Sequence, residues 1–266
     1  MAAGEVRLER MIDILTALGE PEGAGAGGLG VVRIAHLVGR EKTQVSRALR
    51  TLAAAGLVER DPVTREYRLG WRLFRLAARV ADQRLLGLSP PVLHGLVGRL
   101  GETAHLSVLD GRDVVTVLSQ PSPRSVRAIE WTGRAVPAAC TSAGRALLLD
   151  HDLASLRLLF PPDLPRLGPR APRDAAELNG RIVAARRHGF VVADEEFEEG
   201  LIGVAAPVRD FRGRIVAALN VSAPAFRLGR RLETAGAEVR SSAQVLSGLL
   251  GWETAAAAET TGGHHG

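Results

Sequence analysis

The segment GREKTQVSRALRTLAAAGLVER, from Gly39 to Arg60, combines a helical repeat of apolar residues with side chains that can hydrogen-bond nucleic-acid bases. The apolar residues that share one helix face are Val45, Ala48, Leu49 and Leu52. Gln44 and Arg47 then lie on the opposite face, where glutamine can bond adenine and arginine can bond guanine. We therefore expect Gln44 and Arg47 to contact DNA bases, the alternative being an ordinary surface helix with solvated side chains.

The neighbouring polar residues suit phosphate groups, because hydroxyl and cationic side chains bind phosphate without reading sequence. The expected phosphate or mixed contacts are Lys42, Thr43, Ser46 and Arg50, and Thr43 is also the expected N-cap of the helix. Arg65 is expected to follow the DNA backbone or enter the minor groove. Between Gly39 and Arg75, nine basic residues face four acidic ones, and this surplus of five equals the net charge of the whole chain.

A second segment, Thr141-Ser142-Ala143-Gly144, has the composition of a helix start that binds an anion. Thr141 can cap the helix, and small side chains leave the amides of Ser142, Ala143 and Gly144 open to a carboxylate. The alternative is a plain N-capped helix packed on a sheet.

Residues for catalysis or metal binding are sparse. Cys140 is the only cysteine, and the seven histidines show no local ligand spacing. Ser142 lacks a Gly-x-Ser-x-Gly context, and there is no phosphate-binding Walker motif. The acidic run from Asp194 to Glu196 is interpreted as a solvated or helix-capping turn. We expect no enzymatic activity, no cofactor and no metal.

The composition, 266 residues with 46% hydrophobic and 24% charged, is that of a globular protein with room for two ordinary domains. Only one of the 34 basic residues is a lysine, so the arginine excess by itself says little about phosphate binding. The chain has no run of 18 apolar residues, and acidic residues interrupt its N-terminal segment, which argues against a signal peptide. The expected location is the cytoplasm.

In the first part of the chain, apolar periodicity predicts helices over residues 8–18, 31–38 and 43–55, followed by two short strands around residues 61–65. Three helices and a hairpin are the order of a winged helix-turn-helix domain. The glycine-rich segment Pro21–Gly30 is expected to be a mobile loop. A linker helix follows from Trp71 to Leu88, and Ser89-Pro90-Pro91 is expected to end it.

The second part mixes strands and helices. The expected strands cover residues 104–109, 114–118, 126–131, 190–194, 203–208 and 215–221. The expected helices cover residues 92–100, 142–149, 153–160, 174–188 and 230–250. Early and late strands separated by helices predict an α+β domain with an antiparallel sheet covered by helices.

Five longer motifs occur in order: TQVSRALRTLAAAGLVERD…REYRLG, GETAHLSVLDGRDVV, TSAGRALLL, HGFVVADEEFEEGLIGVAAPV and IVAALNVSAP. With them the chain resembles the IclR family of bacterial transcriptional regulators over nearly its whole length. The resemblance implies a winged helix-turn-helix DNA-binding domain over residues 1–70, a linker helix over 71–90 and an effector-binding domain related to GAF and PAS folds over 91–252. The composition of residues 253–266, rich in Ala, Thr and Gly, predicts a disordered tail. It also implies a homodimer or dimer of dimers on a partly palindromic double-stranded DNA operator.

The resemblance also indicates effector-binding positions. Relatives that bind small oxo-acids use an Asp and a Cys where this chain has Ala193 and Gly203, together with polar residues where it has Asn220 and Ser222. The two departures are expected to enlarge the cavity for a ligand larger or more apolar than glyoxylate or pyruvate, such as an aromatic acid. Asn220 and Ser222 alternate onto one face of a strand and could orient that ligand.

The expected function is therefore a DNA-binding transcriptional regulator controlled by a small metabolite, with the effector acting through the linker helix. An effector-independent DNA-binding or architectural protein is the main alternative, and an enzyme of small-molecule metabolism is the weakest one.

Overall fold

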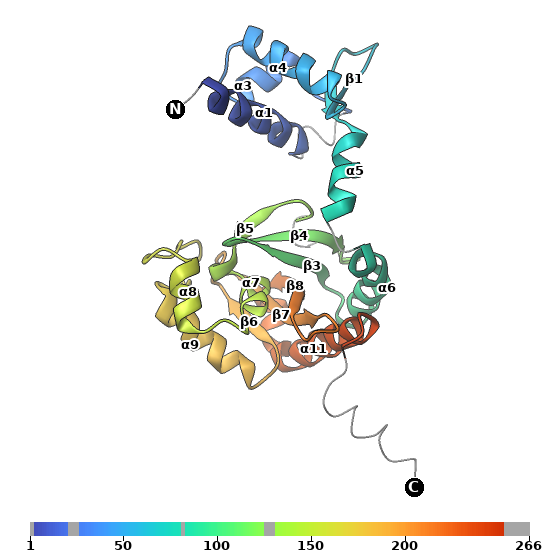
Figure 1. Cartoon of the computed structure of the whole chain (residues 1–266). Helices are drawn as coiled ribbons and strands as arrows, with labels where there is room; N and C mark the ends of the chain where they lie inside the picture. Colours follow the sequence, from blue (N-terminus) through green and yellow to red (C-terminus); the bar gives the residue numbers. More distant parts are fainter. Residues whose placement is uncertain (1–2, 21–26, 81–82, 125–130, 253–266) are drawn as a thin grey trace. The chain divides into compact units, whose positions relative to one another are not determined.

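Residues 3–20, 27–80, 83–124 and 131–252 are described in a computed structural model of the chain (Figure 1). The chain divides into two units, residues 1–83 and residues 84–266, and each is described by itself. No helix within the described ranges is long and apolar enough to cross a membrane.

The first unit has the expected order of three helices, a hairpin and a further helix. Its elements are α1 (Ala3–Gly19), α3 (Val31–Leu37), α4 (Lys42–Ala54), β1 (Val58–Arg60), β2 (Tyr67–Leu69) and α5 (Trp71–Val80). The strands β1 and β2 pair antiparallel, with Glu59 opposite Arg68. The core between α1, α3 and α4 is formed by Ile14, Leu18, Ile34, Leu49 and Leu52, all almost completely buried. The winged helix-turn-helix prediction is confirmed.

Residues just before α3 belong to the wing rather than to a mobile loop. Leu29 forms a bridge to Tyr67, with its amide 2.8 Å from the Tyr67 carbonyl oxygen and its carbonyl oxygen 2.9 Å from the Tyr67 amide. A Cβ on Gly28 would lie 2.8 Å from that same carbonyl oxygen, so only glycine allows this approach. The expectation of a loop up to Gly30 was wrong at this end, and residues 21–26 lie outside the described ranges.

The second unit is an α+β domain built on one antiparallel sheet. Its strands are β3 (Thr103–Asp110), β4 (Asp113–Gln120), β5 (Ala135–Pro137), β6 (Val191–Asp194), β7 (Leu201–Arg209) and β8 (Ile215–Pro224). They lie in the order β5-β4-β3-β8-β7-β6. The helices are α6 (Gln83–Leu100), α7 (Ser142–Leu147), α8 (Leu153–Leu159), α9 (Ala175–Arg186), α10 (Ala225–Leu228) and α11 (Leu232–Leu249). The short strand β5 was missed in the sequence, and the strand expected over 126–131 falls outside the described residues except for Trp131.

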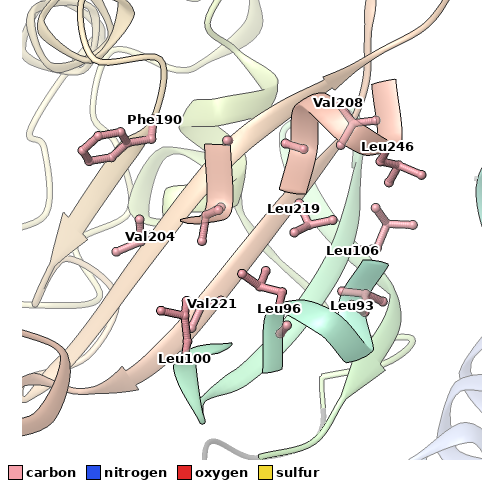
Figure 2. Close-up of a cluster of buried hydrophobic side chains, with 14 of the residues drawn as sticks. Leu93, Leu96, Leu100, Leu106, Phe190, Val204, Val208, Leu219, Val221 and Leu246 are labelled. Atoms are coloured by element: carbon pink, nitrogen blue, oxygen red, sulfur yellow. The ribbon is translucent and has the colours of Figure 1, made fainter. Parts of the chain in front are cut away.

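Helices cover both faces of the sheet, and the alternation of side chains along each strand decides what each face meets. Figure 2 shows one face, where Leu106, Val204 and Leu219 pack with leucines of α6 and α11. The opposite face packs against α7, α8 and α9 through a second apolar cluster that includes Ala205 and Ala218. This second face also receives the polar residues of the candidate site.

The helix α6 runs through Pro90 and Pro91, so the expectation that Ser89-Pro90-Pro91 ends the helix was wrong. Both prolines are exposed, and so is Gly87, whose carbonyl group loses its helical donor at Pro91. Water can therefore hydrate that carbonyl group. The hydroxyl of the buried Ser89 donates to the Leu85 carbonyl oxygen at 2.6 Å, which adds one bond within the same turns.

Candidate DNA-binding surface and effector cavity

The helix α4 has one apolar and one polar face, as its sequence predicts. Val45, Ala48, Leu49 and Leu52 are buried in the core of the first unit. The predicted DNA-binding residues of the helix lie on the outer side: Lys42, Thr43, Gln44, Arg47 and Arg50 are exposed, and Ser46 is half-buried. Core packing therefore fixes which side chains α4 offers to a partner.

The start of α4 differs from the prediction. The helix begins at Lys42, and the Glu41 carbonyl oxygen accepts hydrogen bonds from the amides of Gln44 and Val45 at 3.0 and 3.1 Å. Glu41 is therefore the N-cap residue, with no side-chain cap, and the prediction of Thr43 as N-cap was wrong. Thr43 lies in the first turn, and its exposed hydroxyl stays available for an external contact.

The wing turn is shaped by Asp61. Its Oδ1 accepts hydrogen bonds from the amides of Val63 and Thr64 at 2.8 and 2.9 Å, and these bonds lower the pKa of the Asp61 carboxyl. Arg65 then adopts a left-handed backbone with φ of 61° and remains exposed at the tip. The structure thus places Arg65 on the wing, where it was predicted.

The arginines of this unit fall into two groups. Arg68 is held by the Glu59 carboxylate at 3.0 Å, and Arg60 lies over the ring of Tyr67. Within the described residues, no ion pair is recorded for Lys42, Arg47 or Arg50. Those three cations are therefore available to phosphate groups without breaking an existing bond.

A small cavity of about 70 Å³ lies between α7 and the polar face of the sheet. It brings together seven of the eight predicted effector-binding residues from four separate segments: Thr141, Ser142, Ala143, Ala193, Gly203, Asn220 and Ser222. Further apolar lining comes from Val114, Val136 and Leu201, and Cys140 also reaches the cavity. The sheet order and the position of α7 therefore bring these seven residues together at one place.

Gly144 is the predicted residue that does not line the cavity, and its role is structural. A Cβ at this position would lie 2.1 Å from the Ala138 carbonyl oxygen, so glycine is needed for α7 to approach the preceding turn. Its amide donates to Thr141 Oγ1 at 3.0 Å. Thr141 is thus the N-cap, as predicted, but the Gly144 amide is not open to a carboxylate, contrary to the expectation. The amides of Ser142 and Ala143 remain as candidate donors.

Gly203 makes room for a neighbouring side chain instead of enlarging the cavity. A Cβ at this position would lie 2.6 Å from Ser142 Oγ and 3.3 Å from Ser142 Cβ. The space that a side chain would occupy is thus filled by Ser142, which is buried. Ala193 lies beside Gly203 in the pairing of β6 with β7, and it is also buried.

Sequence reasoning missed His105, Ser107 and Thr116, which also line the cavity. Ser107 Oγ donates to Asn220 Oδ1 at 3.3 Å and lies 3.4 Å from Thr116 Oγ1. His105 is 2% exposed, and burial lowers its pKa to about 4. The available signal was the alternation Ala-His-Leu-Ser along β3, which puts both polar residues on one face.

Two aromatic residues line another part of the cavity. The rings of Trp131 and Phe197 meet edge to face, with centroids 5.3 Å apart. The guanidinium group of Arg134 lies 5.2 Å from the centre of the Trp131 ring. The cavity therefore has hydroxyl, amide and imidazole groups on the sheet and an aromatic wall beside them.

The acidic turn from Asp194 to Glu196, predicted to be solvated or to cap a helix, contains a buried ion pair. Glu196 is 5% exposed, and its Oε1 accepts a hydrogen bond from Arg145 Nη2 at 2.6 Å. Arg181 Nη1 lies 2.9 Å from the other carboxylate oxygen, an ion pair without hydrogen-bond geometry. Burial raises the pKa of Glu196, and the two guanidinium groups oppose this. The prediction was wrong for Glu196, which holds α7 and α9 together.

A larger open cleft of about 860 Å³ lies on the α9 side of this ion pair and contains five arginines. Its cations are largely matched by carboxylates, because Arg170 pairs with Asp194 and Arg173 with Glu177. The cleft is therefore a poorer anion site than its size suggests. Within the described ranges, no three His, Cys, Asp or Glu residues are grouped as metal ligands.

Known protein families and proteins resemble this chain over both units. The IclR helix-turn-helix domain matches residues 7–62, and the C-terminal domain of the bacterial transcriptional regulator IclR matches residues 77–248. The HTH-type transcriptional regulator BhcR of Paracoccus denitrificans is 32% identical over 250 residues, which cover 92% of this chain and 88% of that protein. The Pca regulon regulatory protein of Pseudomonas putida is 32% identical over 205 residues, which cover 76% of this chain and 70% of that protein.

A crystal structure of an IclR homologue from Microbacterium hydrocarbonoxydans, complexed with 4-hydroxybenzoate, has the same fold. It covers 92% of this chain and 98% of its own at a TM-score of 0.77 and 24% identity. The first unit has an exposed helix α4 and a wing, as a helix-turn-helix domain requires. The two family domains together span most of the sequence. The chain belongs to the IclR family of bacterial transcriptional regulators.

Proposed function

We propose that this regulator binds its operator through α4 and is controlled by a small organic or aromatic acid in the cavity beneath α7. The observation that carries the proposal is the convergence of the predicted effector-binding residues on one cavity. A concave site with an apolar wall and a few placed polar groups is typical of small-molecule binding.

On the DNA side, Gln44 and Arg47 contact base edges in the major groove, and the hydroxyls and cations beside them contact phosphate groups. Support comes from the helix itself: its N-terminal residues are exposed, and its apolar face is already buried. Helix-turn-helix proteins present the N-terminal residues of this helix to the bases. Arg65 contacts the backbone or the minor groove from the wing.

On the effector side, the acid lies with its polar end against the sheet and its ring against Trp131 and Phe197. The present volume of about 70 Å³ is small for an aromatic acid. Trp131 is only half-buried, so its side chain can move outward when the ligand enters. Asn220 and Ser222 orient the ligand, while the amides of Ser142 and Ala143 approach its carboxylate.

The regulator acts as a homodimer, or as a dimer of dimers, on a partly palindromic operator. The linker that contains α5 connects the two functions, and the effector changes operator affinity through it. A typical coupling free energy between two such sites is about 1–3 kcal/mol, which corresponds to roughly a 5- to 150-fold change in affinity. The expected cellular location is the cytoplasm.

The test measures both sites in one protein. Thermal unfolding of the full chain is followed against a panel of organic and aromatic acids, with 4-hydroxybenzoate as the first probe. An acid that raises the unfolding temperature is then added to a gel-shift titration on DNA from upstream of the gene. A matching change in DNA affinity supports the proposal. An unchanged DNA affinity with every stabilising acid would instead favour an effector-independent DNA-binding protein, and conversion of an acid would favour an enzyme.

A further inference from the structure

The effector cavity contains a buried base but no charged side chain. Its described lining consists of His105 together with hydroxyl, amide, thiol and apolar groups, and it includes no Asp, Glu, Lys or Arg. A carboxylate that enters it leaves water and meets no cation, and burying an unpaired charge is costly. The amides of Ser142 and Ala143 can hydrogen-bond the carboxylate but carry no net charge, so an acid effector needs a counter-charge that arises within the site.

His105 has two hydroxyl partners that respond to its protonation. Its Nδ1 lies 2.9 Å from Ser119 Oγ, and its Nε2 lies 3.2 Å from Ser222 Oγ. In neutral imidazole one ring nitrogen is an acceptor, so one of the two hydroxyls donates its hydrogen to the ring. In imidazolium both nitrogens donate, so neither hydroxyl gives its hydrogen to the ring. Ser222 lines the cavity, so its hydroxyl can then donate to a ligand carboxylate.

Among the side chains around His105, the imidazole is the group best able to take up a proton, because the others are neutral or already paired. The polar side chains that β4, β8 and α7 contribute to the cavity are hydroxyls and an amide. Cys140 is the only other titratable group in the described lining, and burial raises its pKa. Glu102, directly before the same strand, accepts two hydrogen bonds from Arg227 at 2.6 and 2.7 Å, and Glu196 is paired with Arg145. Without ligand, burial lowers the pKa of His105 to about 4, so the ring is neutral near pH 7.

We propose that an acid effector binds in this cavity together with one proton from solvent, which His105 takes up. The carboxylate accepts a hydrogen bond from Ser222, the imidazole becomes imidazolium by forming one N–H bond, and the two charges neutralise each other. The inference rests on the proposed effector site. It makes the regulator bind its acid effector more tightly as the pH falls.

The test is isothermal titration calorimetry of the full chain with 4-hydroxybenzoate at about pH 7.5, in two buffers with different heats of ionisation. The difference in binding heat gives the number of protons taken up, and we expect about one per ligand. His105→Gln keeps a polar side chain but cannot become charged, so its uptake should be close to zero. His94→Gln removes an exposed histidine of α6 and should keep the uptake of the unmodified protein.

Two further measurements need no variant. The affinity of the unmodified protein for 4-hydroxybenzoate should fall about tenfold per pH unit between about pH 6.5 and 8.5. The neutral analogue 4-hydroxybenzamide should bind without proton uptake and without this pH dependence. If His105→Gln does not fold, the absence of this pH dependence would still overturn the inference.

Binding of 4-hydroxybenzoate without proton uptake, or the same uptake in His105→Gln, would overturn the inference and leave the effector site intact. If neither this acid nor any other acid of the panel binds, the proposed function fails and the inference fails with it.

Discussion

Replacing Gly203 by alanine tests whether this glycine exists to accommodate Ser142. The new methyl group would lie 2.6 Å from Ser142 Oγ and 3.3 Å from Ser142 Cβ, well inside normal contact distance. Ser142 is buried at the start of α7, so it cannot simply turn toward solvent. Overpacking of this kind costs about 1–3 kcal/mol. We expect the Gly203→Ala variant to lose about 1–2 kcal/mol of unfolding free energy after the small entropic gain from removing a glycine.

Equilibrium denaturation in urea measures this change, and two variants make it specific. Gly180→Ala places a methyl group where nothing lies within 4 Å, in the exposed part of α9, and should stabilise by about 0.4–1 kcal/mol. Ser142→Gly combined with Gly203→Ala removes the clashing hydroxymethyl group and should restore much of the loss, a coupling that a double-mutant cycle reports. A Gly203→Ala protein as stable as the unmodified one would refute the steric explanation.

Three other substitutions test the DNA-binding helix, the buried ion pair and the buried histidine. Arg47→Ala should weaken specific operator binding by about 1–3 kcal/mol if Arg47 bonds a base. The control variant Arg157→Ala, on the exposed side of α8, should leave operator binding unchanged. Equal gel-shift affinities of the two variants would refute the base contact. Glu196→Gln removes the carboxylate that pairs with the buried Arg145, while Arg181 keeps its ion pair with Glu177. It should destabilise by about 3–5 kcal/mol, against less than about 0.5 kcal/mol for the exposed Glu199→Gln, measured by urea denaturation. Because the folded-state pKa of His105 is about 4, below the ordinary value of 6.5, the unfolded chain binds the extra proton between these pH values. Stability should therefore be full above about pH 6.5 and fall by about 3 kcal/mol toward pH 4, and a His105→Gln protein with the same acid profile would contradict this.

The parts that sequence predicted well depend on local periodicity. The inward and outward faces of α4 follow from residues three and four apart, so Gln44 and Arg47 could be placed outside without a structure. The N-cap was less predictable, because Glu41 caps α4 with its backbone carbonyl and leaves no side-chain signature. Pro90 and Pro91 were misread because two exposed prolines can remain in a helix when solvent hydrates the carbonyl groups that they leave.

Only part of the effector site could be predicted from the sequence, because the site depends on how distant strands pair. Asn220 lies opposite His105 in the pairing of β3 with β8, and this register brings the imidazole beside Ser222. Nothing near His105 in the sequence indicates that neighbour. Gly203 was interpreted as a lost side chain that enlarges the cavity, whereas Ser142, sixty-one positions earlier in the numbering, fills the space. The family resemblance indicated residues that line the site, whereas only the packing shows the structural role of each one.

We expect an acid in the cavity beneath α7 to change the affinity of α4 for DNA. The most direct measurement is a gel-shift titration on DNA from upstream of the gene, with and without a stabilising acid, for the unmodified protein and for Ala193→Leu. The leucine side chain would fill a cavity of only about 70 Å³ while leaving the DNA-binding unit untouched. We expect the acid to change the DNA affinity of the unmodified protein at least about fivefold and that of Ala193→Leu not at all, with equal affinities in the absence of acid. If the Ala193→Leu protein responds to the acid like the unmodified one, the acid does not act through the cavity beneath α7.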